Sequence, residues 1–204
     1  MGLVARYLVP PLLDRIMRSE LLLDERRKCA GGAQGRVLEV GIGSGLNFPY
    51  YGAAVSEVVG VDPSQGLQKR AKARAAGLSF SVSHVEASAE VMPLDDASFD
   101  TALTTWSLCS IPDPSAALHE IRRLLKPTAR LLFVEHGLSP DGGVARWQNR
   151  LNGSWRCLSA GCNMNRRMDK LIEAAGFAIV GLETGYIEGP RVLGYLYRGA
   201  ARPR

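Results

Sequence analysis

The chain has 204 residues, of which 46% are hydrophobic and 22% are charged, so its length and composition suit one globular domain with a full hydrophobic core. We therefore expect a single domain over residues 1–204. The net charge is +5, but apart from "DERRK" at residues 24–28 the basic residues are scattered, which argues against a protein that binds nucleic acid.

The N-terminal region predicts a helix rather than a targeting segment. Residues 1–35 contain neither the order of a signal peptide nor an apolar run of about 18 residues, so we expect a cytoplasmic protein. An amphipathic stretch covers residues 5–28, and its apolar side consists of Leu8, Leu12, Leu13, Ile16, Met17, Leu21 and Leu22. We expect residues 1–30 to form a helical lid or to pack on the sheet, with contact to a membrane surface as the less favoured alternative.

Strand and helix patterns alternate along the rest of the chain. Short runs rich in Val, Leu and Phe predict strands at 36–41, 57–62, 78–84, 99–105 and 129–135. Helical patterns occupy 65–76 after the N-cap Ser64, 115–126 from Ser115, and 166–175. The runs 177–184 and 191–199 predict an antiparallel hairpin, and residues 197–204 are expected to fray at their end. This alternation predicts an α/β fold with a doubly wound, mainly parallel sheet.

A glycine-rich loop follows the first predicted strand. Its spacing is G-x-G-x-G, with Gly41, Gly43 and Gly45, whereas the dinucleotide pattern would need its third glycine at Leu46. Glycines in the first strand-to-helix turn allow a ligand to approach the backbone closely. Glu39 adds a carboxylate beside the loop, which would repel a pyrophosphate and favour a ligand with an ammonium group and a sulfonium.

A second carboxylate ends the second predicted strand. Asp62 stands in "VVGVDPS", 17 residues beyond Gly45, where a carboxylate can accept hydrogen bonds from both hydroxyls of a ribose. Either feature alone would be weak evidence of function. Their order, followed by "ASAEVMPLDDASFD", makes the pattern specific.

With these motifs the chain resembles the class I S-adenosylmethionine-dependent methyltransferases. The resemblance covers about residues 36–136 and rests on "VLEVGIGSG", "VVGVDPS", "ASAEVMPLDDASFD", "TTWSLCSIPDP" and "EIRRLLKPTARLLFVEH". It implies a Rossmann-like methyltransferase fold with a seven-stranded sheet whose last strand is antiparallel. It also implies S-adenosylmethionine as the cofactor and a small-molecule methyl acceptor.

The resemblance implies a role for each residue of the matching motifs. Those expected to bind the methionine part, the ribose and the adenine of the cofactor are Glu39, Gly41, Gly43, Gly45, Asp62, Pro63, Ser64, Ala89, Glu90 and Thr105. Ser88 departs from the family pattern, because many members carry Asp there. Trp106 would face the methyl group and the acceptor, although packing is an equal alternative for this residue.

A general base is needed only for an acceptor that arrives protonated. His136 follows Glu135 at the end of the fifth predicted strand, where a base could act on the acceptor. The alternative for His136 is a polar residue that fixes the strand end.

The acceptor is chosen by segments added around the common sheet. Residues 137–165 form such an insertion on the acceptor side, with Trp147 and Trp155 suggesting an apolar pocket. The segments "LCS", "EH" and "GCNMNR" resemble the branch that includes alkyl thiol methyltransferases, so a thiol acceptor is expected. C- or N-methylation of a quinone precursor or a phospholipid stays open, as does a non-catalytic cofactor-binding protein.

The four cysteines, Cys29, Cys109, Cys157 and Cys162, include no C-x-x-C pair and lack the spacing of a zinc module. Reduced thiols and no metal are therefore expected. Metalloid binding by Cys109 and Cys162 was the less favoured alternative, because partly apolar cysteines more often lie in a core.

Overall fold

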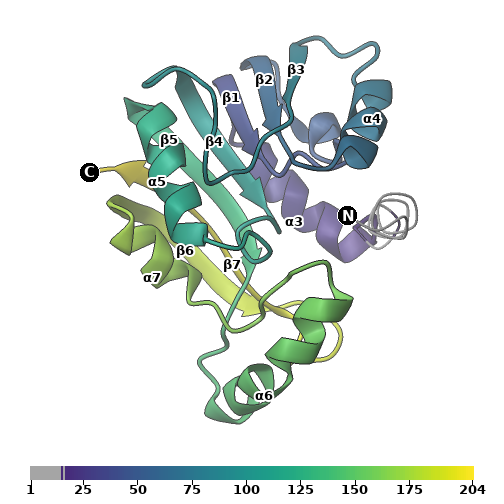
Figure 1. The fold of residues 1–204 in the computed structure, drawn as a ribbon, viewed down its shortest axis with the longest axis vertical. Helices are drawn as coiled ribbons and strands as arrows, with labels where there is room; N and C mark the ends of the chain where they lie inside the picture. The colour runs from purple at the N-terminus through teal and green to yellow at the C-terminus, as the bar shows by residue number, and fades with distance from the viewer. Residues whose placement is uncertain (1–14, 16) are drawn as a thin grey trace.

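The computed structural model describes residue 15 and residues 17–204, and it contains one seven-stranded sheet (Figure 1). The strand order is β3-β2-β1-β4-β5-β7-β6. The pairs from β3 to β5 are parallel, whereas β7 runs antiparallel to both β5 and β6. The structure confirms the predicted doubly wound sheet with its C-terminal antiparallel hairpin.

The elements follow one another in alternation along the chain. They are α3 (Glu20–Ala30), β1 (Gly35–Val40), the 3-10 turn η1 (Phe48–Tyr50), β2 (Val55–Val61), α4 (Gln65–Arg74), β3 (Ser81–Val85), β4 (Phe99–Thr105), α5 (Pro114–Leu124), β5 (Leu125–His136), α6 (Gly142–Leu158), α7 (Met168–Ala174), β6 (Phe177–Tyr186) and β7 (Tyr195–Pro203). All five strands predicted before the hairpin are present, with shifts at their ends.

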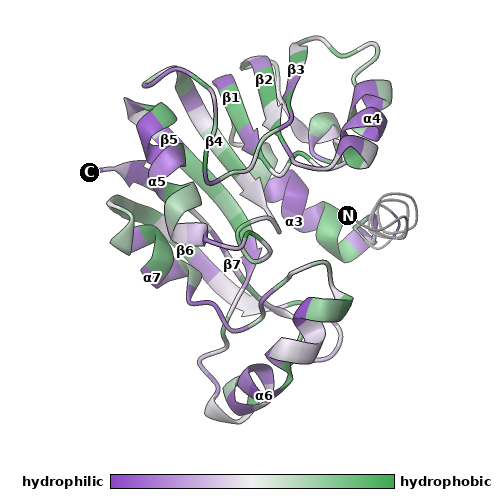
Figure 2. Cartoon of the chain, in the orientation of Figure 1, coloured by the Kyte–Doolittle hydropathy of each residue, from purple (hydrophilic) through white to green (hydrophobic). Residues whose placement is uncertain are grey.

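The central strands are apolar because helices cover both faces of the sheet. In β1, Val37 and Leu38 are fully buried, and Val37 pairs with Val58 of β2 and Thr101 of β4. Figure 2 shows hydrophobic residues concentrated in these strands, whereas α4 is mainly hydrophilic on its outer side. The core therefore lies on both faces of β1, β4 and β5.

The helices divide between the two faces, as neighbouring residues of β7 show. Arg198 pairs with Glu25 of α3, while the adjacent Tyr197 lies near Arg167 and Asp169 at the start of α7. Because successive strand residues point to opposite faces, α3 and α7 cover opposite sides of the sheet. Helix α5 contacts α7 and lies on the same face of the sheet as α7. Helix α3 packs against β5 on the opposite face.

The start of α5 differs from the sequence prediction. The N-cap is Asp113 rather than Ser115, and Pro114 occupies the first helical position. Asp113 Oδ1 accepts hydrogen bonds from the backbone N–H groups of Ser115 and Ala116, at 3.0 Å each. At the N-cap position, Asp accepts hydrogen bonds from the first backbone N–H groups of a helix as well as Ser does. Proline suits the next position because the N–H that it lacks would have no partner within the helix. The helix therefore begins earlier than predicted.

The predicted fraying of the C-terminus is wrong. Strand β7 continues to Pro203, and Ala201 is fully buried between Leu131 of β5 and Ile179 of β6. The backbone N–H of Arg204 donates to the carbonyl of Gly176 at 2.9 Å. Pairing on both edges of β7 holds a segment whose Ala, Pro and Arg content alone would not predict a strand.

Two segments were predicted to lie around the common sheet, namely the N-terminal helix and the insertion 137–165. From the N-terminal amphipathic stretch, Leu8, Leu12, Leu13 and Ile16 lie outside the described residues, whereas Leu22 is a buried residue of α3. In the insertion 137–165, α6 lies apart from the sheet at the bottom of Figure 1. Gln148 is its buried residue, and Trp147, with 54% of its surface exposed, points to solvent.

Within residues 17–204, no helix is both long and apolar enough to cross a membrane.

Candidate active site

The glycine loop follows β1 at the carboxyl edge of the sheet. Gly41 and Gly45 have φ values of +74° and +78°, in the left-handed region that favours glycine. A side chain at Gly41 would overlap Ser107 in the loop after β4, and one at Gly45 would overlap the ring of Phe48. The loop therefore brings bare backbone to the end of the strands, as the sequence predicted.

Asp62 is held beside this loop. Its Oδ2 accepts from the backbone N–H of Gly43 at 2.9 Å, and its Oδ1 accepts from the backbone N–H of Ser64 at 2.7 Å. Burial raises the pKa of the Asp62 carboxyl, and these two hydrogen bonds oppose the shift. The structure brings Asp62 and the glycines together, with a second lone pair on each carboxylate oxygen still able to accept from a ribose.

A buried polar network lies under the same loop and joins α3 to β1 and β4. Glu39 accepts from Asn47 Nδ2 at 2.7 Å and from the Tyr51 hydroxyl at 2.6 Å. Arg26 of α3 donates to Asn47 Oδ1 at 3.0 Å and to Thr105 Oγ1 at 2.7 Å. Asn47 Nδ2 also donates to Thr105 Oγ1, at 3.0 Å. The network fixes Glu39 and Thr105, two residues expected to bind the cofactor, through partners from other elements.

Burial perturbs both charged groups of this network. Loss of solvent raises the pKa of Glu39 to about 7, although hydrogen bonds from Tyr51 and Asn47 and the charge of Arg26 oppose the rise. Loss of solvent also lowers the pKa of Arg26 to about 10, against the attraction of Glu39. Arg26 Nε is buried and has no partner among the described residues. The site thus combines a carboxylate with a guanidinium that still has donor capacity.

Three members of this network, namely Arg26, Asn47 and Tyr51, were not predicted from the sequence. Arg26 lies in the charged run "DERRK", which reads as a solvated helix face. A usable signal was present, because Leu22, Arg26 and Cys29 stand on one helical stripe, and all are buried. An arginine on an apolar stripe needs a buried partner, and Glu39 is the nearby carboxylate that attracts it.

Trp106 follows β4 in a strained conformation. Its φ is +53°, which is an outlier for a bulky residue, and its backbone N–H donates to Val134 at 2.8 Å. The Arg26 guanidinium lies 4.9 Å from the centre of the Trp106 ring. The indole Nε1 is buried without a partner among the described residues. Trp106 is thus buried in the hydrophobic core with an indole donor that no described residue uses, and its position at the methyl-transfer site stays a prediction.

Pro63, Ser64, Ala89 and Glu90 were expected around the adenine. Pro63 and Ser64 follow Asp62 directly, and Ser64 also caps α4 by accepting from the N–H of Leu67 at 3.4 Å. Ala89 is buried in the loop after β3. Glu90 Oε1 accepts from the backbone N–H of Asp113 at 3.2 Å, so one of its oxygens holds the loop before α5.

His136 ends β5 on the acceptor side. The preceding Glu135 is fully buried and accepts from the backbone N–H groups of Ser107 and Leu108 at 3.0 Å and of Cys109 at 3.1 Å. His136 Nδ1 lies 3.5 Å from the Cys162 sulfur. Hydrogen bonding with Cys109 and the neighbouring imidazole lower the pKa of the Cys162 thiol. Glu135 therefore fixes the loop after β4, while His136 contacts a cysteine that the sequence did not place near it.

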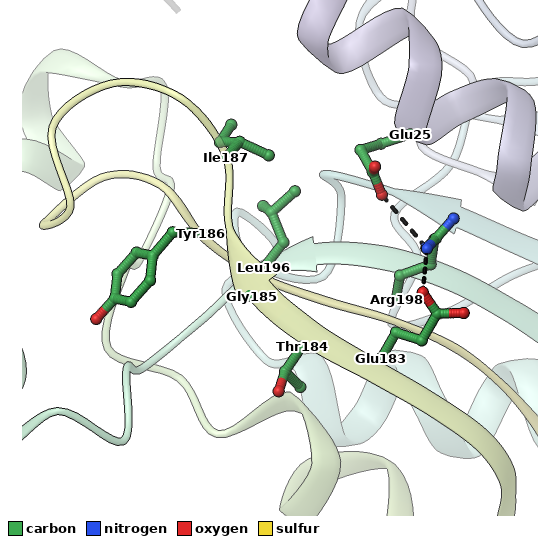
Figure 3. Close-up of a pocket in the computed structure, with 8 residues that line it drawn as sticks. All are labelled: Glu25, Glu183, Thr184, Gly185, Tyr186, Ile187, Leu196 and Arg198. Carbon is green, nitrogen blue, oxygen red and sulfur yellow. Dashed lines mark hydrogen bonds and ion pairs between the residues drawn. The ribbon is translucent and has the colours of Figure 1, made fainter.

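A cavity lies between α3 and the β6–β7 hairpin (Figure 3). In the close-up, Arg198 lies between Glu25 and Glu183 and pairs with both, with its Nε 3.3 Å from Glu25 Oε2. Leu196, another lining residue, pairs with His136 in the sheet register. The two carboxylates exceed the single Arg198 charge by one, and none of the residues expected to bind the cofactor lines this cavity.

Known proteins resemble the chain in sequence and in fold. Residues 38–133 match the family model described as a methyltransferase domain. The thiol S-methyltransferase TMT1B of Rattus norvegicus is 35% identical over 151 residues, which are 72% of this chain and 62% of that protein. Its Homo sapiens counterpart is 33% identical over 158 residues, which are 74% of this chain and 64% of that protein. This chain thus spans less than two thirds of the length of these relatives.

Among solved structures, the YcgJ protein of Bacillus subtilis has a TM-score of 0.71 at 18% identity, with 89% of this chain and 97% of that chain covered. The similarity in fold therefore covers more of the chain than residues 38–133, which match the family model. The chain belongs to the class I S-adenosylmethionine-dependent methyltransferases. Within this class it lies near the thiol S-methyltransferases.

Proposed function

We propose that the protein transfers the methyl group of S-adenosylmethionine to a small thiol. The observation that carries the cofactor part of the proposal is the buried network under the glycine loop, in which Asn47 joins Glu39 to Arg26. The thiol acceptor is supported by the similarity to thiol S-methyltransferases. A free amino acid end carries an ammonium group and a carboxylate. The Glu39 carboxylate suits the first, and the unpartnered Arg26 Nε suits the second.

The other residues proposed to contact the cofactor lie at the same edge of the sheet. Asp62 would accept hydrogen bonds from the ribose hydroxyls. The close packing of Gly41 on Ser107 and of Gly45 on Phe48 fixes the loop, whose backbone would border the ligand. Ala89 and Glu90 would border the adenine together with residues 63–64. When bound, S-adenosylmethionine supplies a methyl group on a sulfonium sulfur, which is an activated electrophile.

The acceptor thiol must lose its proton as its sulfur attacks the methyl group in line with the leaving sulfur. We assign the proton to His136, a half-buried residue at the end of β5. Trp106 would border the methyl-transfer site and help to exclude water. The new sulfur–carbon bond forms as the sulfonium–carbon bond breaks, so the products are a methyl thioether and the demethylated cofactor.

A labelled-methyl assay tests the proposal. The acceptor panel contains sulfide, small alkyl thiols, a quinone precursor and phosphatidylethanolamine, and cofactor binding is measured alongside by calorimetry. Label in the thiols alone is the expected result. Label in the quinone precursor or the phospholipid would replace the thiol by a carbon or nitrogen acceptor. Cofactor binding without transfer to any acceptor would indicate a non-catalytic binding protein.

The base has a separate test in the His136→Gln variant. Loss of a positioned base should lower kcat for thiols by about 10²–10⁴-fold, while the cofactor Kd stays unchanged. His119 is exposed on α5, so His119→Gln is the matched control. Unchanged kcat in the His136 variant would leave His136 with the structural role of fixing the strand end.

We also propose a cytoplasmic single domain in which residues 1–30 act as a lid and residues 137–165 line the acceptor. The placement of Arg26 beside Thr105 supports the lid, because α3 then completes the cofactor site. Its amphipathic pattern keeps membrane contact as the alternative. Cell fractionation tests the location, and sedimentation with anionic vesicles would reveal membrane binding.

A further inference from the structure

Two cysteines and a histidine from distant parts of the chain converge on the acceptor side. Cys109 lies in the loop after β4, His136 ends β5, and Cys162 lies between α6 and α7. The two sulfurs and one imidazole nitrogen all lie within 4.8 Å of one another. The three residues are separated by more than 20 positions in the chain, so only the fold brings them together.

The separations approach those of ligands around one small metal ion. Tetrahedral zinc has Zn–S bonds of about 2.3 Å and Zn–N bonds of about 2.0 Å, which place its ligand atoms roughly 3.5–3.8 Å apart. The Cys162 sulfur and His136 Nδ1 are 3.5 Å apart, within this range. A small inward movement of the Cys109 side chain would bring the third ligand atom to the same spacing.

The backbone around Cys109 is held by several contacts. Its N–H donates to Glu135 Oε2 at 3.1 Å. Its carbonyl accepts from the backbone N–H of Asn163 at 2.8 Å and from Asn163 Nδ2 at 3.1 Å. Because Asn163 follows Cys162 directly, these bonds tie the two cysteine-bearing loops together. Arg166 donates to the carbonyl of Ile111 at 2.7 Å and reinforces the same loop.

The charges also suit a divalent cation. Two thiolates and a neutral imidazole would balance a charge of +2 in a largely buried position. Arg166 is the nearby cation that would oppose binding, but its guanidinium is directed to the carbonyls of Ile111 and Pro112. Soft sulfur ligands with one imidazole select zinc over magnesium or calcium.

We propose that Cys109, His136 and Cys162 bind one Zn²⁺ ion through the two sulfurs and His136 Nδ1, with a fourth position left for water or a small thiolate. The site can be tested without the methyl-transfer assay, and it departs from the expectation of no metal drawn from the cysteine spacing. The two roles of His136 exclude each other, so the base proposed for methyl transfer belongs to the metal-free protein. Zinc on Nδ1 leaves the His136 ring without a free lone pair. The zinc-bound form therefore cannot use His136 as a base.

Cobalt binding tests the site directly. Reduced protein freed of metal with a chelator is titrated with Co²⁺, which gives thiolate charge-transfer and tetrahedral d–d absorption bands in a site of this kind. We expect one equivalent of Co²⁺ to produce both bands and Zn²⁺ to abolish them. Wild-type protein that shows no thiolate band at saturating Co²⁺ would overturn the proposal.

Matched variants locate the ligands. Cys162→Ser and Cys109→Ser should each lose the thiolate band of the three-ligand site, whereas Cys157→Ser, at an exposed cysteine, should keep it. His136→Asn should weaken Co²⁺ binding by more than about tenfold. Cofactor calorimetry and a melting curve show whether each variant is folded, and Cys162→Ser decides the case if the buried Cys109 variant does not fold. Unchanged bands in Cys162→Ser, or their loss in Cys157→Ser, would contradict the site.

Discussion

The cofactor side and the acceptor side of this molecule differ in the exposure of their large side chains. On the cofactor side, Glu39 and Arg26 are almost fully buried and share their partners in one network. On the acceptor side, α6 extends away from the sheet, and Trp147 and Leu158 are exposed. A rigid, buried network suits a ligand of fixed chemistry, whereas an open flank can vary without disturbing it. With the proposed function, cofactor binding and acceptor choice would therefore fall to separate regions of the fold.

The largest effect is expected from Glu39→Ala on the cofactor side. This change leaves the Tyr51 hydroxyl, Asn47 and the Arg26 charge buried without their carboxylate partner. The free energy of unfolding should fall by about 3–5 kcal/mol, as measured by urea denaturation. Glu57→Ala is the control, because Glu57 makes a partly exposed ion pair with Arg36, and its loss should cost no more than about 1 kcal/mol. Equal costs for the two variants would remove the contrast between buried and exposed charges.

Asp62→Ala should affect binding more than folding. Loss of charged hydrogen bonds to the ribose should weaken cofactor binding by about 1–3 kcal/mol in calorimetry. Asp24→Ala, at an exposed carboxylate that pairs with Arg27, serves as the control and should leave the affinity unchanged. Unchanged affinity in the Asp62 variant would refute the ribose assignment.

The pH dependence of stability offers a third comparison. The pKa of Glu39 is about 7 in the folded protein, above its ordinary value of 4.5, because burial disfavours the charged form. A raised pKa means that the folded state binds the proton more tightly than the unfolded state. The contribution of Glu39 is therefore full below about pH 4.5 and is lost as the pH rises to about 7.

Glu39→Gln isolates this contribution from the other titrating groups. Between pH 4.5 and pH 7, the unfolding free energy of the wild type should decrease relative to the variant by about 1–3 kcal/mol. Parallel pH profiles for the two proteins would show that the Glu39 pKa is not raised on folding.

The smallest effect is expected on the acceptor side. Trp147→Ser should change the unfolding free energy by less than about 0.5 kcal/mol, because 54% of the Trp147 surface is exposed. Thermal or urea unfolding measures it, with Trp106→Ser as the buried comparison that should cost several times more. A large loss of stability in the Trp147 variant would show that α6 belongs to the rigid part of the molecule.

The sequence predicted best those features that depend on short stretches of chain. The glycine loop, Asp62 and the alternation of strands and helices are set by neighbours a few residues apart, so local patterns revealed them. Arg26 was hidden in a charged run, because its partners Asn47 and Thr105 are 21 and 79 residues away. A single sequence carries no direct signal of such distant contacts.

The acceptor side was harder to predict for the same physical reason. The approach of Cys109, His136 and Cys162 depends on two separate loops meeting at the end of β5. The extent of β7 is decided by pairing with β5 and β6 rather than by the propensity of its own residues. The apolar pocket was expected around Trp147 and Trp155. Trp147 points to solvent, whereas Trp155 is half-buried and packs against the hydrophobic core.

The most direct test of the account compares two ligands of the cofactor site by calorimetry. S-adenosylhomocysteine carries the amino acid end that Glu39 and Arg26 are proposed to bind, whereas methylthioadenosine keeps the nucleoside and lacks that end. We predict that S-adenosylhomocysteine binds at least about 100-fold more tightly, since two charged contacts of about 1.5–3 kcal/mol each are lost with methylthioadenosine. Equal affinity for the two ligands would contradict the assignment of the buried network to the amino acid end of the cofactor.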